Sequence, residues 1–208
     1  MSGMEAVALI REARRFRPYS EALYPALSVD PFYHALEVRA PAGQDSRAAM
    51  LAYYDYSALE AERFGVLCTP PSGAYGASIW AKPMSVTDAD AKSQSKAAVL
   101  RAAMGAECLR CYQEINENMT VTTTPVAKPE DWYLSILGVS PEFQGQGLGA
   151  GLILPVLEQA DAAGVATYLE TFTPRNMPFY TRLGFAEHGP FHEPVTGCDY
   201  WVMRRPAE

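Results

Sequence analysis

The sequence predicts one domain of the mixed α/β (α+β) class, in which helices flank a central sheet. Short apolar runs of β-prone residues alternate with longer segments of helical periodicity. The second half contains one strand–helix–strand unit, and a chain of 208 residues suits a single hydrophobic core. We therefore expect residues 1–208 to form one domain.

Composition limits the partners and the setting that we expect. A net charge of −7 argues against a nucleic-acid surface, and no apolar run approaches the roughly 18 residues of a membrane span. The first five residues lack the basic start of a secretory signal. The four cysteines are not evenly spaced in the manner of a disulfide framework, which predicts reduced thiols and a cytoplasmic location.

The N-terminal part predicts short helices rich in aromatic residues. Residues 6–11 are apolar enough for a helix or a strand, and periodicity does not decide between the two. Pro25 and the pair Asp30-Pro31 interrupt residues 19–38, which predicts short helical pieces. An apolar or small residue recurs at helical spacing over residues 47–63, which predicts a helix there.

The middle of the chain predicts a hairpin followed by a helix. Residues 64–68 and 74–81 resemble two strands around a Pro-Pro-Ser-Gly turn. Residues 83–93 are polar and predict a loop, whereas apolar residues at three- and four-residue steps predict a helix over 96–115. Cys108 and Cys111 lie on that apolar stripe without a second cysteine or histidine pair, so we expect buried thiols rather than a zinc or redox site.

The second half predicts the strands and helices around which the fold is organised. After a linker at 120–131, residues 132–139 and 166–171 predict two buried strands, joined by a helix that Pro155 should bend. Thr173-Pro174 predicts the start of a further helix that ends at Gly184, with Thr173 capping it. Residues 185–188 and 198–204 predict a closing pair of strands.

A glycine-rich loop lies between the strand at 132–139 and the helix that follows. Gly145, Gly147, Gly149 and Gly151 occur at every second position, so the backbone there can approach a ligand closely. The first N–H groups of a helix have no partner within it, and an anion placed there satisfies them. The pattern predicts a phosphate site.

Two kinds of phosphate ligand fit this loop. Residues 145–150 also satisfy a dinucleotide fingerprint, with Glu170 where a ribose-binding acid would lie. However, residues 140–144 separate the fingerprint from the strand end, and too little chain follows for the further strand–helix units of a doubly wound domain. A nicotinamide cofactor is therefore the weaker alternative.

The loop resembles the acyl-CoA-binding motif of the GNAT superfamily of N-acetyltransferases, through Gln144, Gly147 and Gly149. The resemblance implies a mostly antiparallel sheet that splays at the cofactor strand, and it favours a strand for residues 6–11. It also implies that the loop N–H groups bind the pyrophosphate of acetyl-CoA and that the preceding strand pairs with the pantetheine arm. The cofactor-binding residues it implies are Leu137, Gly138, Val139, Gln144, Gly145, Gln146, Gly147, Leu148, Gly149, Ala150, Thr173, Asn176 and Phe179.

A second segment carries the same resemblance. Residues 179–185 are similar to the family's Phe-Tyr, two residues, Leu-Gly-Phe block, and with Tyr-Leu-Glu-Thr before them they look most like the puromycin N-acetyltransferase branch. The resemblance covers residues 131–185 well and the first 64 residues poorly. Many relatives carry an asparagine seven positions before the tyrosine, where this chain has Thr173; its own asparagine is Asn176.

Three residues are candidates for the chemistry. The resemblance implies that Tyr180 protonates the departing thiolate, since a phenol of pKa about 10 is protonated at neutral pH. Glu170, at the end of a buried strand, could take the proton of the attacking amine if burial makes it a stronger base. Tyr24-Pro25 resembles a substrate-facing Tyr-Pro of the puromycin enzyme. His34, His188 and His192 lack metal-ligand spacing, and we expect them in loops or on the surface.

The sequence thus predicts an acetyl-CoA-dependent N-acetyltransferase that acts on a primary amine of a small molecule in a ternary complex, without a metal. Residues 19–60 should supply the acceptor pocket. The alternative from another class is a CoA-binding regulatory module without catalysis. We expect neither a nucleic-acid nor a membrane partner, and a homodimer remains open.

Overall fold

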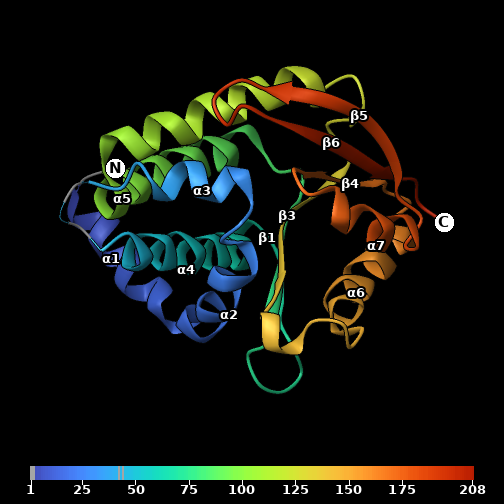
Figure 1. Ribbon diagram of the computed structural model, residues 1–208, viewed down its shortest axis with the longest axis horizontal. Helices are drawn as coiled ribbons and strands as arrows, with labels where there is room; N and C mark the ends of the chain where they lie inside the picture. The colour runs from blue at the N-terminus through green and yellow to red at the C-terminus, as the bar shows by residue number, and fades with distance from the viewer. Residues whose placement is uncertain (1–2, 42, 44) are drawn as a thin grey trace.

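A six-stranded sheet forms the centre of the computed structural model, which describes residues 3–41, 43 and 45–208. The strand order is β1-β2-β3-β4-β6-β5 (Figure 1). The β3–β4 pair is parallel and the other four pairs are antiparallel, which confirms the predicted mostly antiparallel sheet and does not fit a doubly wound dinucleotide-binding domain. The strands are β1 (Gly65–Cys68), β2 (Gly76–Ala81), β3 (Trp132–Val139), β4 (Thr167–Thr171), β5 (Ala186–Glu193) and β6 (Cys198–Arg205).

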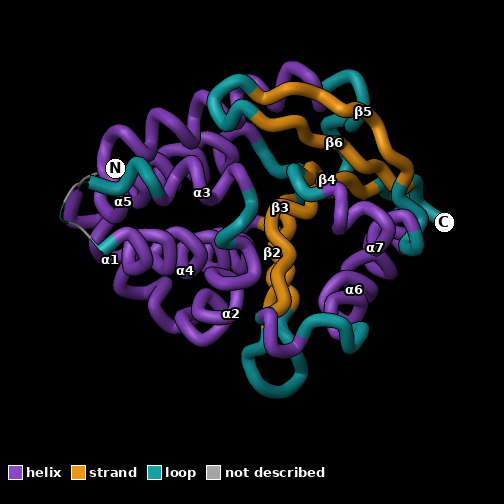
Figure 2. Tube along the Cα trace, viewed as in Figure 1, coloured by secondary structure: helices purple, strands orange, loops and turns teal. Residues whose placement is uncertain are grey.

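Helices cover the two faces of the sheet unequally. Figures 1 and 2 show α1 to α5 gathered on one side of β3, with α6 and α7 on the other. Each side has its own hydrophobic cluster, the larger beneath α1 to α5. The α-helices are α1 (Gly3–Ala13), α2 (Arg17–Leu27), α3 (Pro31–Glu37), α4 (Ser46–Phe64), α5 (Val86–Thr123), α6 (Leu148–Ala162) and α7 (Met177–Thr181).

A β-bulge lies in the middle of β3. Ile79 of β2 pairs with Ile136, but the next residue, Trp80, pairs with Leu134, so Ser135 is an extra residue. Residues two apart on a regular strand share a face, yet Leu134 belongs to the cluster under α6 and Ile136 to the cluster under α1 to α5. The bulge thus changes which face the later side chains of β3 occupy.

The strands β3 and β4 separate just where the bulge occurs. Their register pairs run from Trp132↔Thr167 to Leu134↔Leu169 and stop there. Ser135 and Glu170 are the first residues beyond the last pair. The sheet therefore splays at β3, as the family resemblance implied, and the far parts of the two strands are not paired with each other.

The crossover between β3 and β4 is the predicted strand–helix–strand unit. The helix α6 runs continuously from Leu148 to Ala162 through Pro155. It ends at a left-handed turn at Gly164 (φ 66°), beside which the N–H of Val165 donates to the carbonyl of Ala160 at 2.9 Å. This turn returns the chain to β4 next to β3.

The strand expected at residues 6–11 is wrong, because these residues lie in α1. Ala6 and Ala13, two helical turns apart, are buried, while most residues between them are exposed. A short apolar run is ambiguous between helix and strand, and one-sided packing decides it here.

The loop expected at 83–93 is also wrong, since α5 begins at Val86. Ser85 caps this helix by accepting from the N–H of Asp88 at 3.1 Å. A kink occurs at Gly105, where φ is 84°, and the helix continues to Thr123, so the linker expected from residue 120 begins later than predicted.

Other predictions about single residues have mixed outcomes. Cys108 and Cys111 are buried in the core, as expected, and all three histidines are exposed. Gly184 adopts the left-handed conformation (φ 89°) expected of it after a helix. The cap expected from Thr173 is wrong: its side chain makes no cap hydrogen bond, and a 3-10 turn at Pro174–Asn176 precedes α7. No helix in the described residues is long and apolar enough to cross a membrane.

Candidate active site

The glycine-rich loop presents open backbone at the start of α6. Gly145 and Gly147 both have a φ of 77°, which favours glycine, and a Cβ at either position would meet no atom within 4 Å. Gly147 is the N-cap residue of α6 and offers no side chain to its N–H groups. Because these N–H groups lie at the positive end of a fifteen-residue helix, the loop is suited to bind an anion.

Four of the predicted cofactor-binding residues meet where β3 enters this loop. The Gln144 side chain donates to the Val139 carbonyl at 2.8 Å, which ties the loop to the strand end. A Cβ on Gly149 would lie 3.5 Å from the Phe179 ring and 3.9 Å from Val139. Phe179 thus packs across the first turn of α6. Leu148, Gly149 and Ala150 form that first turn, and Gln146 lies exposed in the loop before it.

Gly138 allows a close approach between β3 and α2. A Cβ there would lie 2.7 Å from Leu23 Cδ2 and 3.3 Å from Ala26 Cβ, so a larger residue would displace α2. Leu137, its neighbour, packs against the cluster on the α6 side. The strand expected to align the cofactor is therefore fixed from both faces.

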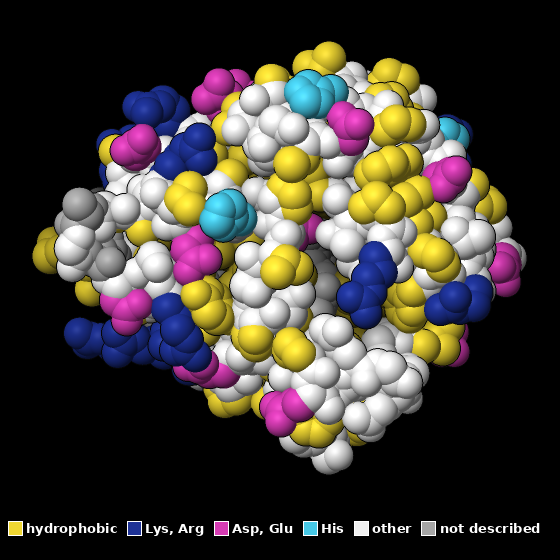
Figure 3. Space-filling view, in the orientation of Figure 1, with side chains coloured by type: hydrophobic (Ala, Val, Ile, Leu, Met, Phe, Trp, Pro, Cys, Tyr) yellow, Lys and Arg dark blue, Asp and Glu magenta, His cyan; other side chains and the backbone are white. Residues whose placement is uncertain are grey.

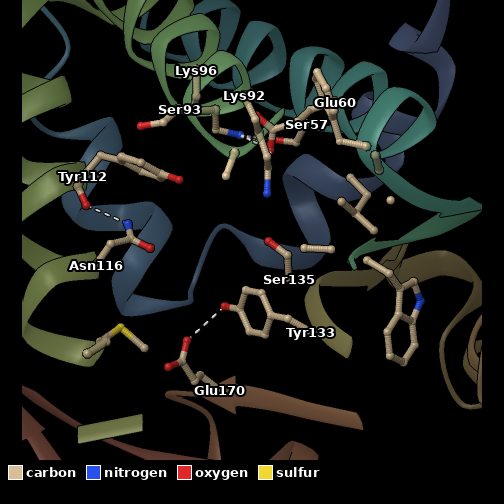
Figure 4. A pocket seen from close by; sticks show the side chains of 18 of the residues that line it. Ser57, Glu60, Lys92, Ser93, Lys96, Tyr112, Asn116, Tyr133, Ser135 and Glu170 are labelled. Carbon is tan, nitrogen blue, oxygen red and sulfur yellow. Dashed lines mark hydrogen bonds and ion pairs between the residues drawn. The ribbon is translucent and has the colours of Figure 1, made fainter. Parts of the chain in front are cut away.

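A cavity of about 600 Å³ lies on the opposite side of β3, beneath α4 and α5. This volume is in the range that encloses a small molecule. Phe32, Tyr33 and Tyr53 of the segment 19–60 line it. Most of the polar groups come from α5, β3 and β4 (Figure 4). The charged residues of its lining are Asp30, Glu60, Lys82, Lys92, Lys96 and Glu170.

Glu170 lies in this cavity at the splay. It accepts hydrogen bonds from Tyr133 Oη at 2.9 Å and from Thr123 Oγ1. Desolvation raises the pKa of the Glu170 carboxyl, and the two hydrogen bonds oppose the rise by stabilising the carboxylate. The result is a stronger base than an exposed glutamate.

Tyr180 is buried on α7 between two aromatic rings. Its ring centroid lies 5.1 Å from Phe179 and 6.0 Å from Phe185, both in edge-on geometry. Burial raises the pKa of the Tyr180 phenol, and the nearby negative charge of Asp30 raises it further. The phenol is therefore held in its protonated form.

Asp30 is a functional candidate that the sequence analysis missed. Its carboxylate accepts from the N–H of Phe32 at 3.0 Å as the cap of α3, and it also interacts with the side chain of Thr173. Burial raises the pKa of Asp30 from 3.8 to about 6. The pair Asp30-Pro31 is a helix-start signal that could have marked the residue, but only the fold brings it towards Tyr180 and the cavity.

A second missed group surrounds Lys96 on α5. Its ammonium donates to Ser57 Oγ at 2.9 Å, lies 3.7 Å from Glu60 Oε1, and stands 4.8 Å from the ring centroid of Tyr53. Lys92 Nζ lies 3.8 Å from the same Glu60 oxygen. Burial lowers the pKa of Lys96, and Glu60 opposes that shift. The sequence offered one signal for this group, because Lys96 is a charged residue at the start of the predicted apolar stripe of residues 96–115.

Tyr24 and Asn176 lie apart from these groups. The Tyr24 hydroxyl donates to Glu37 Oε1 at 2.6 Å, and the Arg47 guanidinium stands 5.3 Å above its ring. Tyr24 is not among the described residues that line the cavity. Asn176 is exposed in the 3-10 turn before α7. The structure thus places Glu170 and Asp30 in the lining of the cavity, whereas Tyr24 is not part of its described lining.

The molecular surface is hollowed at the splay. Figure 3 shows a depression near the centre of this face, between the helices of the N-terminal half and the part formed by α6 and α7. The site is thus a splayed pair of strands with an anion-binding loop on one side and a charged, aromatic cavity on the other. This arrangement suits a class of protein that binds an anionic ligand at the loop and a small molecule in the cavity.

Comparison with known proteins supports this class. Residues 105–185 match the model of the acetyltransferase (GNAT) family. An uncharacterized N-acetyltransferase of Schizosaccharomyces pombe is 35% identical over 79 residues, which cover 36% of this chain and 32% of that protein. The chain thus spans about a third of that relative. A second match, to an uncharacterized protein of Mycobacterium leprae, is 27% identical and covers 38% of this chain and 23% of that protein.

Solved structures share the whole fold. A Corynebacterium glutamicum protein described as a histone acetyltransferase HPA2 and related acetyltransferase aligns with a TM-score of 0.61 at 21% identity, over 93% of this chain and 91% of its own. Arylalkylamine N-acetyltransferase 2 of Aedes aegypti aligns with a TM-score of 0.58 at 15% identity, over 91% and 95%. Both structures are less than 25% identical to this chain, so they show a shared fold, while the match to the acetyltransferase (GNAT) family is confined to residues 105–185. That family in general uses acetyl-CoA.

Proposed function

We propose that the protein is an acetyl-CoA-dependent N-acetyltransferase that acetylates a primary amine of a small molecule by direct attack in a ternary complex. The observation that carries this proposal is the separation of β3 from β4 beyond Leu134 and Leu169. The separation begins at Ser135 and Glu170, which line the cavity beneath α4 and α5, and the anion-binding loop of α6 follows the far end of β3. Two substrates can therefore approach one point from opposite faces of the sheet.

The loop and the strand end suit the acyl carrier. The open backbone at Gly145 and Gly147, together with the uncapped start of α6, would bind its diphosphate. The far part of β3 would align its pantetheine arm, which needs backbone groups along an extended segment. Phe179 and Gly149 then form the wall between the loop and Tyr180.

The transfer requires two proton movements. The neutral amine attacks the thioester carbonyl carbon through its nitrogen lone pair, and Glu170 takes the proton that the nitrogen releases as the bond forms. The tetrahedral intermediate then collapses with cleavage of the C–S bond. The departing thiolate takes the phenolic proton of Tyr180. Before this step, the negative charge of Asp30 helps to keep the phenol protonated because it raises the pKa of Tyr180. The products are an acetamide and free CoA thiol.

An amine screen with detection of thiol release tests this proposal. We expect acetyl-CoA to raise the melting temperature more than NADH does, and at least one amine to support thiol release above the hydrolysis background. Acetyl-CoA binding without turnover of any amine would instead support the regulatory module. Stabilisation by NADH and not by acetyl-CoA would contradict both.

Several finer assignments belong to the same proposal. The Tyr-Leu-Glu-Thr strand and the residues that follow it support placement near the puromycin N-acetyltransferase branch. We also propose one catalytic domain over residues 1–208, a cytoplasmic location on account of the reduced cysteines, and no nucleic-acid or membrane partner. Size-exclusion chromatography with light scattering would determine whether the chain forms a homodimer.

A further inference from the structure

The cavity beneath α4 and α5, which is the acceptor cavity of the proposed function, has charged side chains at two ends. Figure 4 shows Lys92, Lys96 and Glu60 together at the α4–α5 end, while Glu170 lies at the opposite end beside Tyr133. The Glu170 end adjoins the splay of β3 and β4, where the proposed transfer takes place. An acceptor that fills the cavity would therefore place its amine at Glu170 and its other end near the lysines.

The lysine end carries a net positive charge. Two ammonium groups lie within 4 Å of a single carboxylate oxygen, at 3.8 Å for Lys92 and 3.7 Å for Lys96. In Figure 4 the Lys92 side chain extends into the cavity. The cavity shields this end from bulk solvent, which strengthens its interaction with a ligand charge compared with an exposed surface.

A cationic group would be the rival occupant of this end. Glu60 Oε2 is buried without a hydrogen-bond partner in the described part of the chain, so it could accept from an incoming donor. A second ammonium placed there would nevertheless face those of Lys92 and Lys96 at the same time. Two positive charges against one negative charge favour an anion.

Aromatic side chains line the space between the two ends. Phe32, Tyr33, Tyr53, Tyr112 and Phe172 all belong to the lining. The rings of Phe32, Tyr33 and Tyr53 pack edge to face with one another or with Tyr112. Such walls suit an apolar or aromatic spacer.

We propose that the acceptor is an amine that carries a carboxylate at its far end, separated from the amine by an apolar or aromatic spacer. This inference rests on the proposed acetyl transfer and names its substrate class. Lys92 and Lys96 bind the carboxylate, and Glu170 receives the amine. An α-amino acid, in which both groups sit on one carbon, would not span the two ends.

Matched acceptors test this class. Acetyl-CoA-dependent thiol release is measured with three acceptors. They are 4-(2-aminoethyl)benzoate, its neutral carboxamide, and the analogue in which an aminomethyl group replaces the carboxylate. We expect kcat/KM for the carboxylate to exceed that of the other two by about tenfold or more, which corresponds to about 1.4 kcal/mol. An equal or higher value for the carboxamide or the aminomethyl compound overturns the inference and leaves the acetyltransferase proposal intact.

Substitution of one lysine supplies the second readout. We expect Lys92→Gln to lower kcat/KM for the carboxylate about tenfold while changing that of the carboxamide less than twofold. Arg101→Gln, which removes a positive charge from an exposed position of the same helix, is the control and should change neither. Equal loss with both acceptors would contradict carboxylate binding. If no amine at all is acetylated, the proposed function fails first and this inference with it.

Discussion

Tyr133 on β3 donates a hydrogen bond of 2.9 Å to Glu170 on β4, at the point where the two strands separate. The bond holds the carboxylate at the acceptor end of the cleft. It also stabilises the charged form and so restrains the rise in the pKa of Glu170 that burial causes. Together with the hydrogen bond from Thr123, this contact influences both the position and the basicity of the proposed base.

Replacement of Glu170 tests its role as the base. Glu170→Gln keeps the shape and the contact with Tyr133 but cannot accept a proton. We expect kcat to fall by about 10²- to 10⁴-fold with little change in acetyl-CoA affinity, as measured by thiol release and calorimetry. A loss smaller than about threefold would show that another group or water removes the proton.

Removal of the Tyr133 hydroxyl should shift the pH dependence of the reaction. Without its hydrogen bond the carboxylate of Glu170 loses a stabilising partner, so the pKa of Glu170 rises further. We therefore expect the acid limb of the kcat/KM profile to move to higher pH in Tyr133→Phe. An unchanged or lower midpoint would contradict the assignment of that limb to Glu170.

Tyr180→Phe should separate chemistry from binding. The ring remains packed between Phe179 and Phe185, so the fold should persist, but the thiolate loses its proton donor. We expect about a 10²- to 10⁴-fold lower kcat and an unchanged dissociation constant for CoA. Retained turnover would show that the thiolate departs without help from this phenol.

Asp30 should make stability depend on pH in a defined direction. Its pKa of about 6 in the folded protein lies above the ordinary 3.8, so the folded protein binds more protons than the unfolded chain between these values. The stability of the wild type relative to Asp30→Asn should therefore fall as the pH rises from about 4 to 6, by on the order of 1 kcal/mol. Asparagine also caps a helix, so denaturation curves of the two proteins isolate the charge.

Two glycines at the start of α6 provide a matched pair. Gly147→Ala places a Cβ on a residue with a φ of 77°, which costs about 1–2 kcal/mol, whereas Gly151→Ala meets no atom within 4 Å inside the helix. We expect the first variant to lower both the melting temperature and the affinity for acetyl-CoA. The second should leave affinity unchanged and raise stability by up to about 1 kcal/mol. Equal effects on affinity would contradict a special role for the left-handed loop.

The second half of the fold could be predicted because its signals are local. A strand, a glycine-rich loop and a helix follow one another between residues 132 and 162, and glycines in left-handed conformations mark the turns at 164 and 184. The errors lie where local signals are weak. The apolar run at 6–11 suits either kind of element, and the first turns of α5 have no apolar stripe, although Ser85 and Asp88 form a recognisable cap.

The candidate site was predicted in part, for a physical reason. Glu170 and Tyr180 lie in segments that carry motifs, so their neighbourhood is encoded nearby in the chain. Asp30, Lys92 and Lys96 reach the cavity only because α3 and α5 pack across the sheet. Such long-range packing leaves little trace in one sequence, apart from a charged residue at a position where the pattern expects an apolar one.

The bulge at Ser135 has a consequence for how this protein could change over time. The extra residue of β3 is defined by its register against β2, whatever its side chain. Substitutions at 135 can therefore alter the wall of the acceptor cavity while the sheet stays open. Loss of a single codon, by contrast, would restore an unbroken β2–β3 ladder and move the side chains of residues 136–139 to the opposite face of the sheet.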